Sequence, residues 1–219
     1  VQKSFANRPQ NPAMPRHVRP EVRRGRVPPA MAASIMSLAW TERAPLRPKR
    51  WGGKEFAGTT AYTWYSDCEY TFNGNTYPAA FIPPEYWALY LEACGAVGGT
   101  PVARDLLGVL VNAYGPIPSD AKARARHKLG AHRDDEPIND PAHDVLMVAL
   151  CATPHATRDF WIYDLEPNSG KTVLTLTHGD VLQADLCNAV HSVQWRKHNA
   201  GQRWVTVTFR VLRPHPNSV

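Results

Sequence analysis

Short apolar stretches recur through the second half of the chain, with polar residues between them. From Asp144 onward they come at intervals of about 8 to 12 residues, and turn-forming residues at 168–170, 178–180 and 199–201 separate them. Several short strands at this spacing are typical of a β-sandwich or a barrel. The strands that this pattern predicts are residues 145–151, 159–163, 172–177, 180–185, 190–195 and 204–212.

The first half of the same region mixes strands with one helix. Residues 61–65 and 69–72 are rich in aromatic and β-branched side chains, and Asn73-Gly74 follows the second segment as a strong hairpin turn signal. Residues 83–96 begin with proline, have Glu85 early and place apolar residues near helical spacing, which predicts a helix. Residues 104–114 form an apolar run that is expected to become a strand near 109–114.

Together these elements predict a mostly β, α+β domain, a double-stranded β-helix (jelly roll) with flanking helices. The composition agrees, because 43% hydrophobic and 20% charged residues in a chain of 219 exclude wholesale disorder. Twenty prolines argue against an all-helical protein. No apolar run approaches the roughly 18 to 20 residues of a membrane span, so no membrane association is expected.

The positive charge is concentrated at the start of the chain. Residues 1–50 hold eleven Lys and Arg against two Glu, a net charge of +9, so the whole-chain charge of +6 leaves −3 for residues 51–219. Residues 1–49 are therefore predicted to be a basic Pro/Arg-rich arm, partly extended, that can follow a polyanion through charge alone. A solubilising tail and an organelle transit segment remain alternatives. Residues 50–219 are predicted to form the folded domain.

The cysteines are few and far apart. Cys68, Cys94, Cys151 and Cys187 contain no Cys-x-x-Cys pair, which argues against a zinc ribbon or a disulfide scaffold. Reduced thiols are expected, and with them an intracellular, reducing compartment, cytoplasmic or nuclear.

Candidate chemistry concentrates around one His-x-Asp motif. His132 and Asp134 would lie on the same face of a strand. A second imidazole would complete a triad of two histidines and one carboxylate, which binds Fe(II) on one octahedral face and leaves other positions open. Among nine histidines His191 is the best candidate, because it lies within an apolar strand, whereas His178 is explained by a turn and His198 by a polar loop.

Four segments of the sequence resemble the AlkB family of Fe(II)/2-oxoglutarate dioxygenases in order and spacing. They are His132-Arg133-Asp134-Asp135-Glu136, His178-Gly179-Asp180, His191-Ser192-Val193 and Thr208-Phe209-Arg210. Upstream, residues 111–114 are similar to the family's Asn-x-Tyr strand, and residues 70–74 to its substrate-side hairpin. The resemblance covers about residues 50 to 212 and is closest to the nuclear DNA-repair homologues of AlkB.

The resemblance implies a role for particular residues of this chain. His132, Asp134 and His191 would be the Fe(II) ligands and form the catalytic centre. The residues expected to bind 2-oxoglutarate, through hydrogen bonds or ion pairs with its two carboxylates, are Asn112, Tyr114, Arg203, Thr208 and Arg210. The residues expected to contact a flipped base are Asp135, which would meet its exocyclic amine, and Tyr70 and Phe72, which would stack on it or line its pocket.

Two features depart from the family pattern. Its two arginines are usually six residues apart, whereas Arg203 and Arg210 are seven apart, so a β-bulge near residues 204–206 would be needed to bring both to one face. Without the bulge, Arg203 would be a surface or phosphate contact. The segment 115–129 is also longer than usual and carries Lys122, Arg124, Arg126 and Lys128 at two-residue spacing, either a phosphate-binding stripe or a solvated loop.

The expected activity is oxidative demethylation of N-alkylated bases in DNA or RNA by a monomeric enzyme that uses Fe(II), 2-oxoglutarate and O₂. A carboxylate at position 135 suits methylated adenine or cytosine, since methylation of a ring nitrogen leaves the base cationic. Two alternatives stay open. One is the same chemistry on a protein, lipid or small-molecule substrate. The other is a nucleic-acid binding module whose iron site has decayed.

Overall fold

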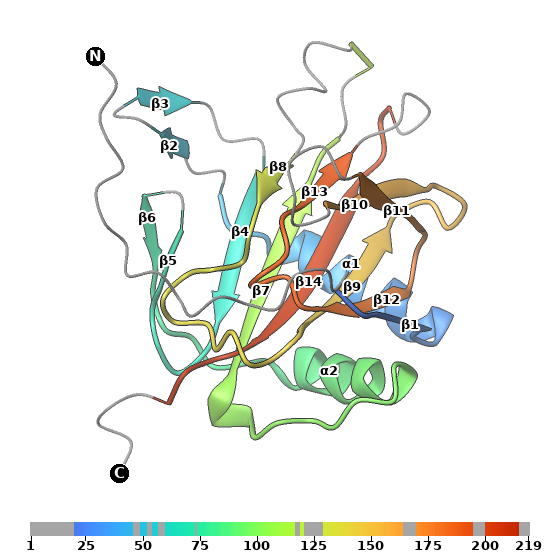
Figure 1. Cartoon of the computed structure of the whole chain (residues 1–219). Helices are drawn as coiled ribbons and strands as arrows, with labels where there is room; N and C mark the ends of the chain where they lie inside the picture. Colours follow the sequence, from blue (N-terminus) through green and yellow to red (C-terminus); the bar gives the residue numbers. More distant parts are fainter. Residues whose placement is uncertain are drawn as a thin grey trace.

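Two antiparallel β-sheets face each other, and the two helices cover the outer face of the larger sheet (Figure 1). The computed structural model describes residues 20–45, 49–51, 54–56, 60–72, 74–116, 119–120, 129–163, 170–194 and 200–214. Within these residues the larger sheet has the strand order β1 (Val22–Arg26), β12 (Asp180–Ala184), β9 (Val145–Cys151), β14 (Trp204–Val211), β7 (Leu107–Tyr114), β4 (Thr60–Tyr65). The smaller sheet has the order β11 (Lys171–Leu176), β10 (Arg158–Tyr163), β13 (His191–Gln194), β8 (Leu129–His132).

Two short hairpins and three helical segments complete the described elements. The hairpins are β2 (Lys49–Trp51) with β3 (Lys54–Phe56), and β5 (Tyr70–Phe72) with β6 (Asn75–Tyr77). The helices are α1 (Pro29–Thr41), α2 (Pro84–Ala96) and the 3₁₀ turn η1 (Arg104–Leu106). This arrangement confirms the predicted mostly β jelly roll. Neither α-helix of the described ranges has the length and apolar character needed to cross a membrane.

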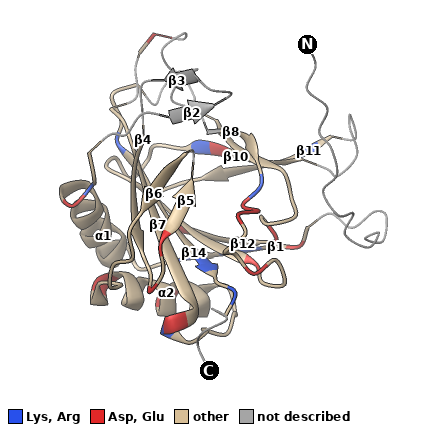
Figure 2. Cartoon of the chain, turned by 90° about the vertical axis from the view of Figure 1, so that its left-hand side faces the viewer, with Lys and Arg blue, Asp and Glu red and all other residues tan. Residues whose placement is uncertain are grey.

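The strand β9 shows how the layers are held together. All seven of its residues are buried, since both faces of the strand are covered. Leu146, Val148 and Leu150 join the core under α1 and α2, whereas Met147 and Ala149 belong to the core between the two sheets. Figure 2 shows the helices on one side of the larger sheet and the smaller sheet on the other. The interior between the sheets is the part of the molecule that contains the candidate site.

The local sequence signals predicted most elements well. The six predicted C-terminal strands match β9 to β14 to within a residue or two, and the predicted helix is α2, with proline in its first turn. The Asn73-Gly74 signal falls between β5 and β6, where Gly74 has a φ of 72°, a left-handed conformation that glycine adopts at little cost.

The predicted basic arm over residues 1–49 differs from the structure. Residues Val22–Arg26 form β1, which pairs with β12 as an edge strand of the larger sheet, and residues Pro29–Thr41 form α1. Ile35 and Met36 of α1 are buried in the main core. Residues 20–41 are therefore part of the folded unit. A pairing between strands about 160 residues apart leaves no local signal in the sequence, which is why β1 was missed. Residues 1–19 lie outside the described residues.

Candidate metal centre

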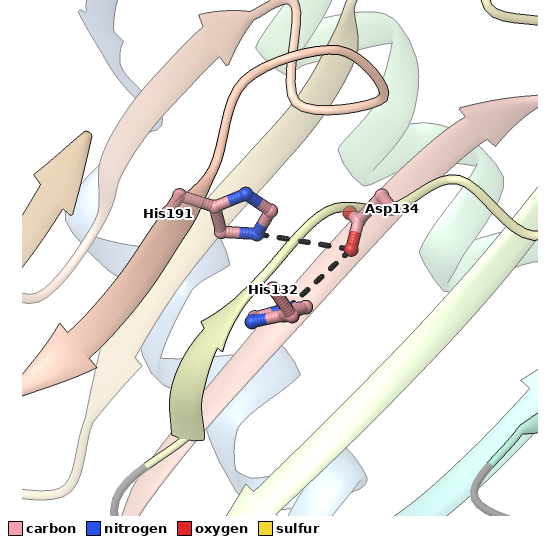
Figure 3. Close-up of side chains that lie close together, drawn as sticks. All are labelled: His132, Asp134 and His191. Atoms are coloured by element: carbon pink, nitrogen blue, oxygen red, sulfur yellow. Dashed lines mark ion pairs between the residues drawn. The ribbon is translucent and has the colours of Figure 1, made fainter. Parts of the chain in front are cut away.

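Two neighbouring strands of the smaller sheet bring three ligand-type side chains together (Figure 3). His132 ends β8 and is paired directly with His191, the first residue of β13. Asp134 lies two residues beyond His132, and its backbone N–H donates a hydrogen bond of 2.9 Å to the carbonyl of Leu186. The predicted triad is thus assembled from segments almost sixty residues apart in the sequence.

The distances within the triad suit a shared metal ion. Asp134 Oδ1 lies 3.6 Å from His132 Nε2 and 3.7 Å from His191 Nε2, and the three ligand atoms are all within 4.8 Å of one another. Two ligand atoms that each lie about 2.1 Å from one ion are at most about 4.2 Å apart. Small adjustments of the side chains therefore close the triad on an ion.

Both histidines are oriented through their other ring nitrogen. Nδ1 of His132 lies 2.8 Å from the carbonyl oxygen of Gly130, and Nδ1 of His191 lies 3.1 Å from that of Ala189. When each Nδ1–H donates to its carbonyl, each Nε2 keeps its lone pair and points toward Asp134. This is the tautomer that a metal ligand requires.

The charges of the site favour an ionised Asp134 carboxylate beside a neutral His191 imidazole. Burial alone would raise the pKa of Asp134, but Arg210, His191 and His132 outweigh it and hold the pKa below its ordinary value. Burial lowers the pKa of His191 to about 4. Two imidazole nitrogens and one carboxylate oxygen are the donor set of Fe(II) oxygenase triads, so the residues present fit an iron ion.

A cavity opens from the triad into the space between the sheets. Four of the five residues predicted to bind 2-oxoglutarate line it: Asn112, Tyr114, Thr208 and Arg210. They face it together because β7 and β14 are paired, with Asn112 opposite Thr206, and because Thr208 and Arg210 share a face of β14. The buried amide oxygen of Asn112 has no hydrogen-bond partner among the described residues, which suits a ligand-binding position.

The structure does not bring Arg203 to this cavity. β14 pairs with both β7 and β9 in unbroken register from Trp204, so the bulge that would have turned Arg203 inward is absent from this described strand. Arg203 is exposed, and its guanidinium lies 4.9 Å from the ring of Trp40 on α1. The prediction that Arg203 binds the cosubstrate is contradicted by this placement, and its place on the inner face of β14 is taken by Trp204.

Arg210 has protein partners as well as a position in the cavity. Its Nη2 lies 3.0 Å from Asp134 Oδ1, and its Nη1 donates a hydrogen bond of 2.6 Å to the hydroxyl of Tyr70. Arg210 therefore neutralises and positions the carboxylate of the triad.

The hairpin residues predicted to contact a base have different positions. Tyr70 is fully buried, stacks on Trp64 at 4.5 Å and accepts the hydrogen bond from Arg210, so it supports the site from behind and is not available to stack on a base. Phe72 is half-buried and lines the cavity. Asp135 is exposed and follows Asp134 directly. The basic stripe 122–128 lies outside the described residues.

One cavity residue was missed by the sequence analysis. Arg158, the first residue of β10, is fully buried and lines the same cavity as the triad. It shares the inward face of β10 with Phe160 and Ile162, since the burial of this strand alternates strictly. The predicted strand began at Asp159, so the arginine was left outside it. Extending the alternation of Phe160 and Ile162 by two residues would have placed Arg158 inside.

Comparison with known proteins supports the fold. No protein-family model and no curated protein matches the sequence. The solved structure of OsALKBH1, an AlkB homologue, superposes with a TM-score of 0.58 at 16% identity and covers 90% of this chain and 99% of its own. A Pseudomonas putida prolyl-4-hydroxylase matches with a TM-score of 0.48 at 12% identity, over 90% of this chain and 93% of its own. The chain thus has the fold of OsALKBH1, and the resemblance to the AlkB family is confirmed at the level of the fold.

Proposed function

We propose that the protein is an Fe(II)/2-oxoglutarate-dependent dioxygenase that oxidatively demethylates N-alkylated bases in nucleic acid. The observation that carries the proposal is the His132, Asp134 and His191 triad, which faces a cavity between the sheets. Iron(II) bound there would supply the oxidation, in which 2-oxoglutarate and O₂ yield succinate and CO₂ while an N-methyl group leaves as formaldehyde.

The chain's own residues bind and orient the reactants. His132, Asp134 and His191 hold the metal, and Arg210 keeps the Asp134 carboxylate ionised and in place. Asn112, Tyr114 and Thr208 present polar groups to the cosubstrate from β7 and β14. The apolar residues between the sheets limit the access of water.

The choice of a nucleic-acid substrate rests on residues at the edge of the site. Asp135 is exposed and adjacent to Asp134 of the triad. A carboxylate there favours a cationic methylated base over the neutral, unmethylated base. Phe72 at the cavity offers an aromatic ring to a flipped base. The basic residues at the start of the chain add charge attraction for a phosphate backbone.

The metal site is tested by removing one ligand. His132→Ala is expected to lower both Mn(II) affinity, measured by calorimetry, and succinate release by roughly 10²-fold or more, because losing a direct ligand costs at least as much as losing a residue that only orients one. The control His155→Ala changes an exposed histidine of another loop and should leave both quantities unchanged. Unchanged succinate release in the His132 variant would refute the proposal.

The substrate is tested with a panel. Methylated DNA and RNA oligonucleotides, incubated with iron, ascorbate and 2-oxoglutarate, should lose methyl groups by mass spectrometry and stimulate succinate release. Stimulation by a protein, lipid or small molecule alone would assign the same chemistry to that class of substrate. No uptake of Mn(II) or 2-oxoglutarate would instead identify a decayed site.

A further inference from the structure

Two arginines of the described residues line the cavity, and they differ in how their charges are balanced. Arg210 lies 3.0 Å from Asp134 and 3.9 Å from Glu136, so two carboxylates already compensate its charge. Arg158 lies among aromatic rings. Its guanidinium is 5.3 Å from the ring of Tyr114 and 5.4 Å from that of Trp204.

Burial is unfavourable for the charge of Arg158, whereas the two aromatic rings attract it. Burial lowers the pKa of Arg158, and the groups that counter this effect are the side chains of Tyr114, through a hydrogen bond, and Cys151. An arginine nevertheless keeps its proton in proteins. A fully buried guanidinium beside a cavity is therefore a site where an anionic ligand gains a strong, water-excluded partner.

A row of neutral polar groups leads from the triad toward this arginine. Along β14, Thr208 and Thr206 follow Arg210 on the face that lines the cavity, and Asn112 of β7 is paired with Thr206. The next inward pair is Tyr114 with Trp204, the two rings that contact Arg158. The cavity thus has a metal-binding end and a guanidinium end, with hydroxyl and amide groups between them.

The dimensions of this row suit a short dicarboxylate. Asn112 and Tyr114 are two residues apart on one strand, which is roughly 7 Å. The carboxylate carbons of an extended five-carbon chain are roughly 5 Å apart, counting four carbon–carbon bonds. A molecule of this length that lies in the cavity with one carboxylate at the level of Asn112 can bring its other carboxylate to the level of Tyr114 and Arg158.

We propose that Arg158 binds the carboxylate of 2-oxoglutarate that lies away from the metal, through a bidentate ion pair supported by Tyr114. This inference rests on the proposed function, because it concerns the cosubstrate of the same site. It replaces the cation that the sequence analysis sought on β14, where Arg203 is exposed and Trp204 faces inward. The anchor is supplied by β10 of the opposite sheet.

The test compares two ligands on two proteins. 2-Oxopentanoate has the same five carbons as 2-oxoglutarate, with a methyl group in place of the remote carboxylate. Calorimetry on the Mn(II)-loaded protein without O₂ should show that Arg158→Gln weakens binding of 2-oxoglutarate by about 10²-fold and that of 2-oxopentanoate by less than about 3-fold. Arg158→Lys keeps the charge and should recover part of the loss, and Arg203→Gln should bind like the unmodified protein.

The outcomes separate this inference from the proposed function. Mn(II) affinity is measured first, and an unchanged value shows that the variant is folded with an intact triad. Equal losses for both ligands, or no loss for 2-oxoglutarate, would overturn the role of Arg158 and leave the proposed function standing. If the unmodified, Mn(II)-loaded protein binds no 2-oxoglutarate, the proposed function itself fails. Should Arg158→Gln not fold, the unmodified protein still decides, since equal affinity for the two ligands excludes any anchor for the remote carboxylate.

Discussion

At the scale of single residues, the charges of the site converge on one oxygen atom. Asp134 Oδ1 faces both imidazole nitrogens of the triad and Nη2 of Arg210. Asp134 and Arg210 are both buried, so neither charge has bulk water to stabilise it. Removing one partner of a buried ion pair destabilises the fold strongly, because the other charge stays buried without compensation. This loss is much larger than the stability that the intact pair adds relative to apolar side chains in the same places.

Arg210→Met tests this arrangement, because it removes the cation that is paired with Asp134. It should lower the free energy of unfolding of the metal-free protein by about 3–5 kcal/mol, because Asp134 keeps a buried charge without its cation. Mn(II) supplies an opposite charge to the same oxygen, so added Mn(II) should stabilise the variant more than the unmodified protein. Urea unfolding with and without Mn(II) measures both effects. Arg133→Met, at an exposed neighbouring position, is the control and should stay within about 0.5 kcal/mol. An equal Mn(II) effect in both proteins would contradict the shared role of Asp134.

At the scale of elements, the alternation of side chains between the two faces of a strand decides which residues reach the cavity. β14 turns Thr206, Thr208 and Arg210 toward the cavity, while Val205, Val207 and Phe209 pack under the helices. A shift of one residue would exchange the two sets. Arg203 precedes the strand and lies two residues before Val205, so it is on the same side of the sheet as Val205. This explains why it lies away from the site. The same alternation in β10 brings Arg158 inside.

The contact between β1 and α2 depends on a glycine. A Cβ atom at Gly25 would lie 2.3 Å from the carbonyl oxygen of Ala96, so the two backbones could approach this closely only with glycine at that position. Gly25→Ala should therefore reduce stability by about 1–3 kcal/mol, measured by urea unfolding, and increase hydrogen exchange of the β1 amides.

Gly95→Ala is the matched control for this variant. No atom lies within 4 Å of a Cβ at this position of α2, and alanine is favoured over glycine within a helix by about 0.5–1 kcal/mol. It should be neutral or stabilising. Equal effects of the two substitutions would show that β1 does not pack closely on α2.

At the scale of the whole molecule, the N-terminal elements and the jelly roll form one unit. β1 extends the larger sheet, and α1 covers its outer face beside α2 (Figure 1). The buried residues of α1 share one core cluster with β7, β9 and β14. A helix that completes a core in this way is expected to unfold together with the domain.

Substitution of a single residue of α1 tests this unity. Ile35 is 3% exposed, and Ile35→Ala should lower the free energy of unfolding by about 2–5 kcal/mol. The transitions followed by circular dichroism and by tryptophan fluorescence should still coincide. Ser37→Ala, on the exposed side of α1, should change stability by less than about 0.5 kcal/mol. Separate transitions for the two signals would mean that α1 is an independent appendage.

The features that could be predicted from the sequence are those that depend on residues close together in the chain. The strands β9 to β14, the helix α2 and the hairpin at Gly74 carry their signals within a few neighbouring residues, and so they could be predicted. The triad could be predicted because His-x-Asp and the apolar strand around His191 are also local patterns. The burial of Tyr70 behind Arg210 could not, since these residues are 140 positions apart and meet only in the folded chain.

The amino-acid sequence alone therefore determined the class of fold, most of its elements and the identity of the three ligand-type residues. Only the tertiary structure decided that residues 22–41 belong to the folded unit, that Arg203 points away from the cavity and that Arg158 lines it. The physical reason is that strand propensity and hydrophobic periodicity act between near neighbours, whereas the face a residue presents is set by pairing with distant strands. In this protein the second buried cation of the cavity comes from β10 of the smaller sheet, and that placement exists only once the two sheets have closed on each other.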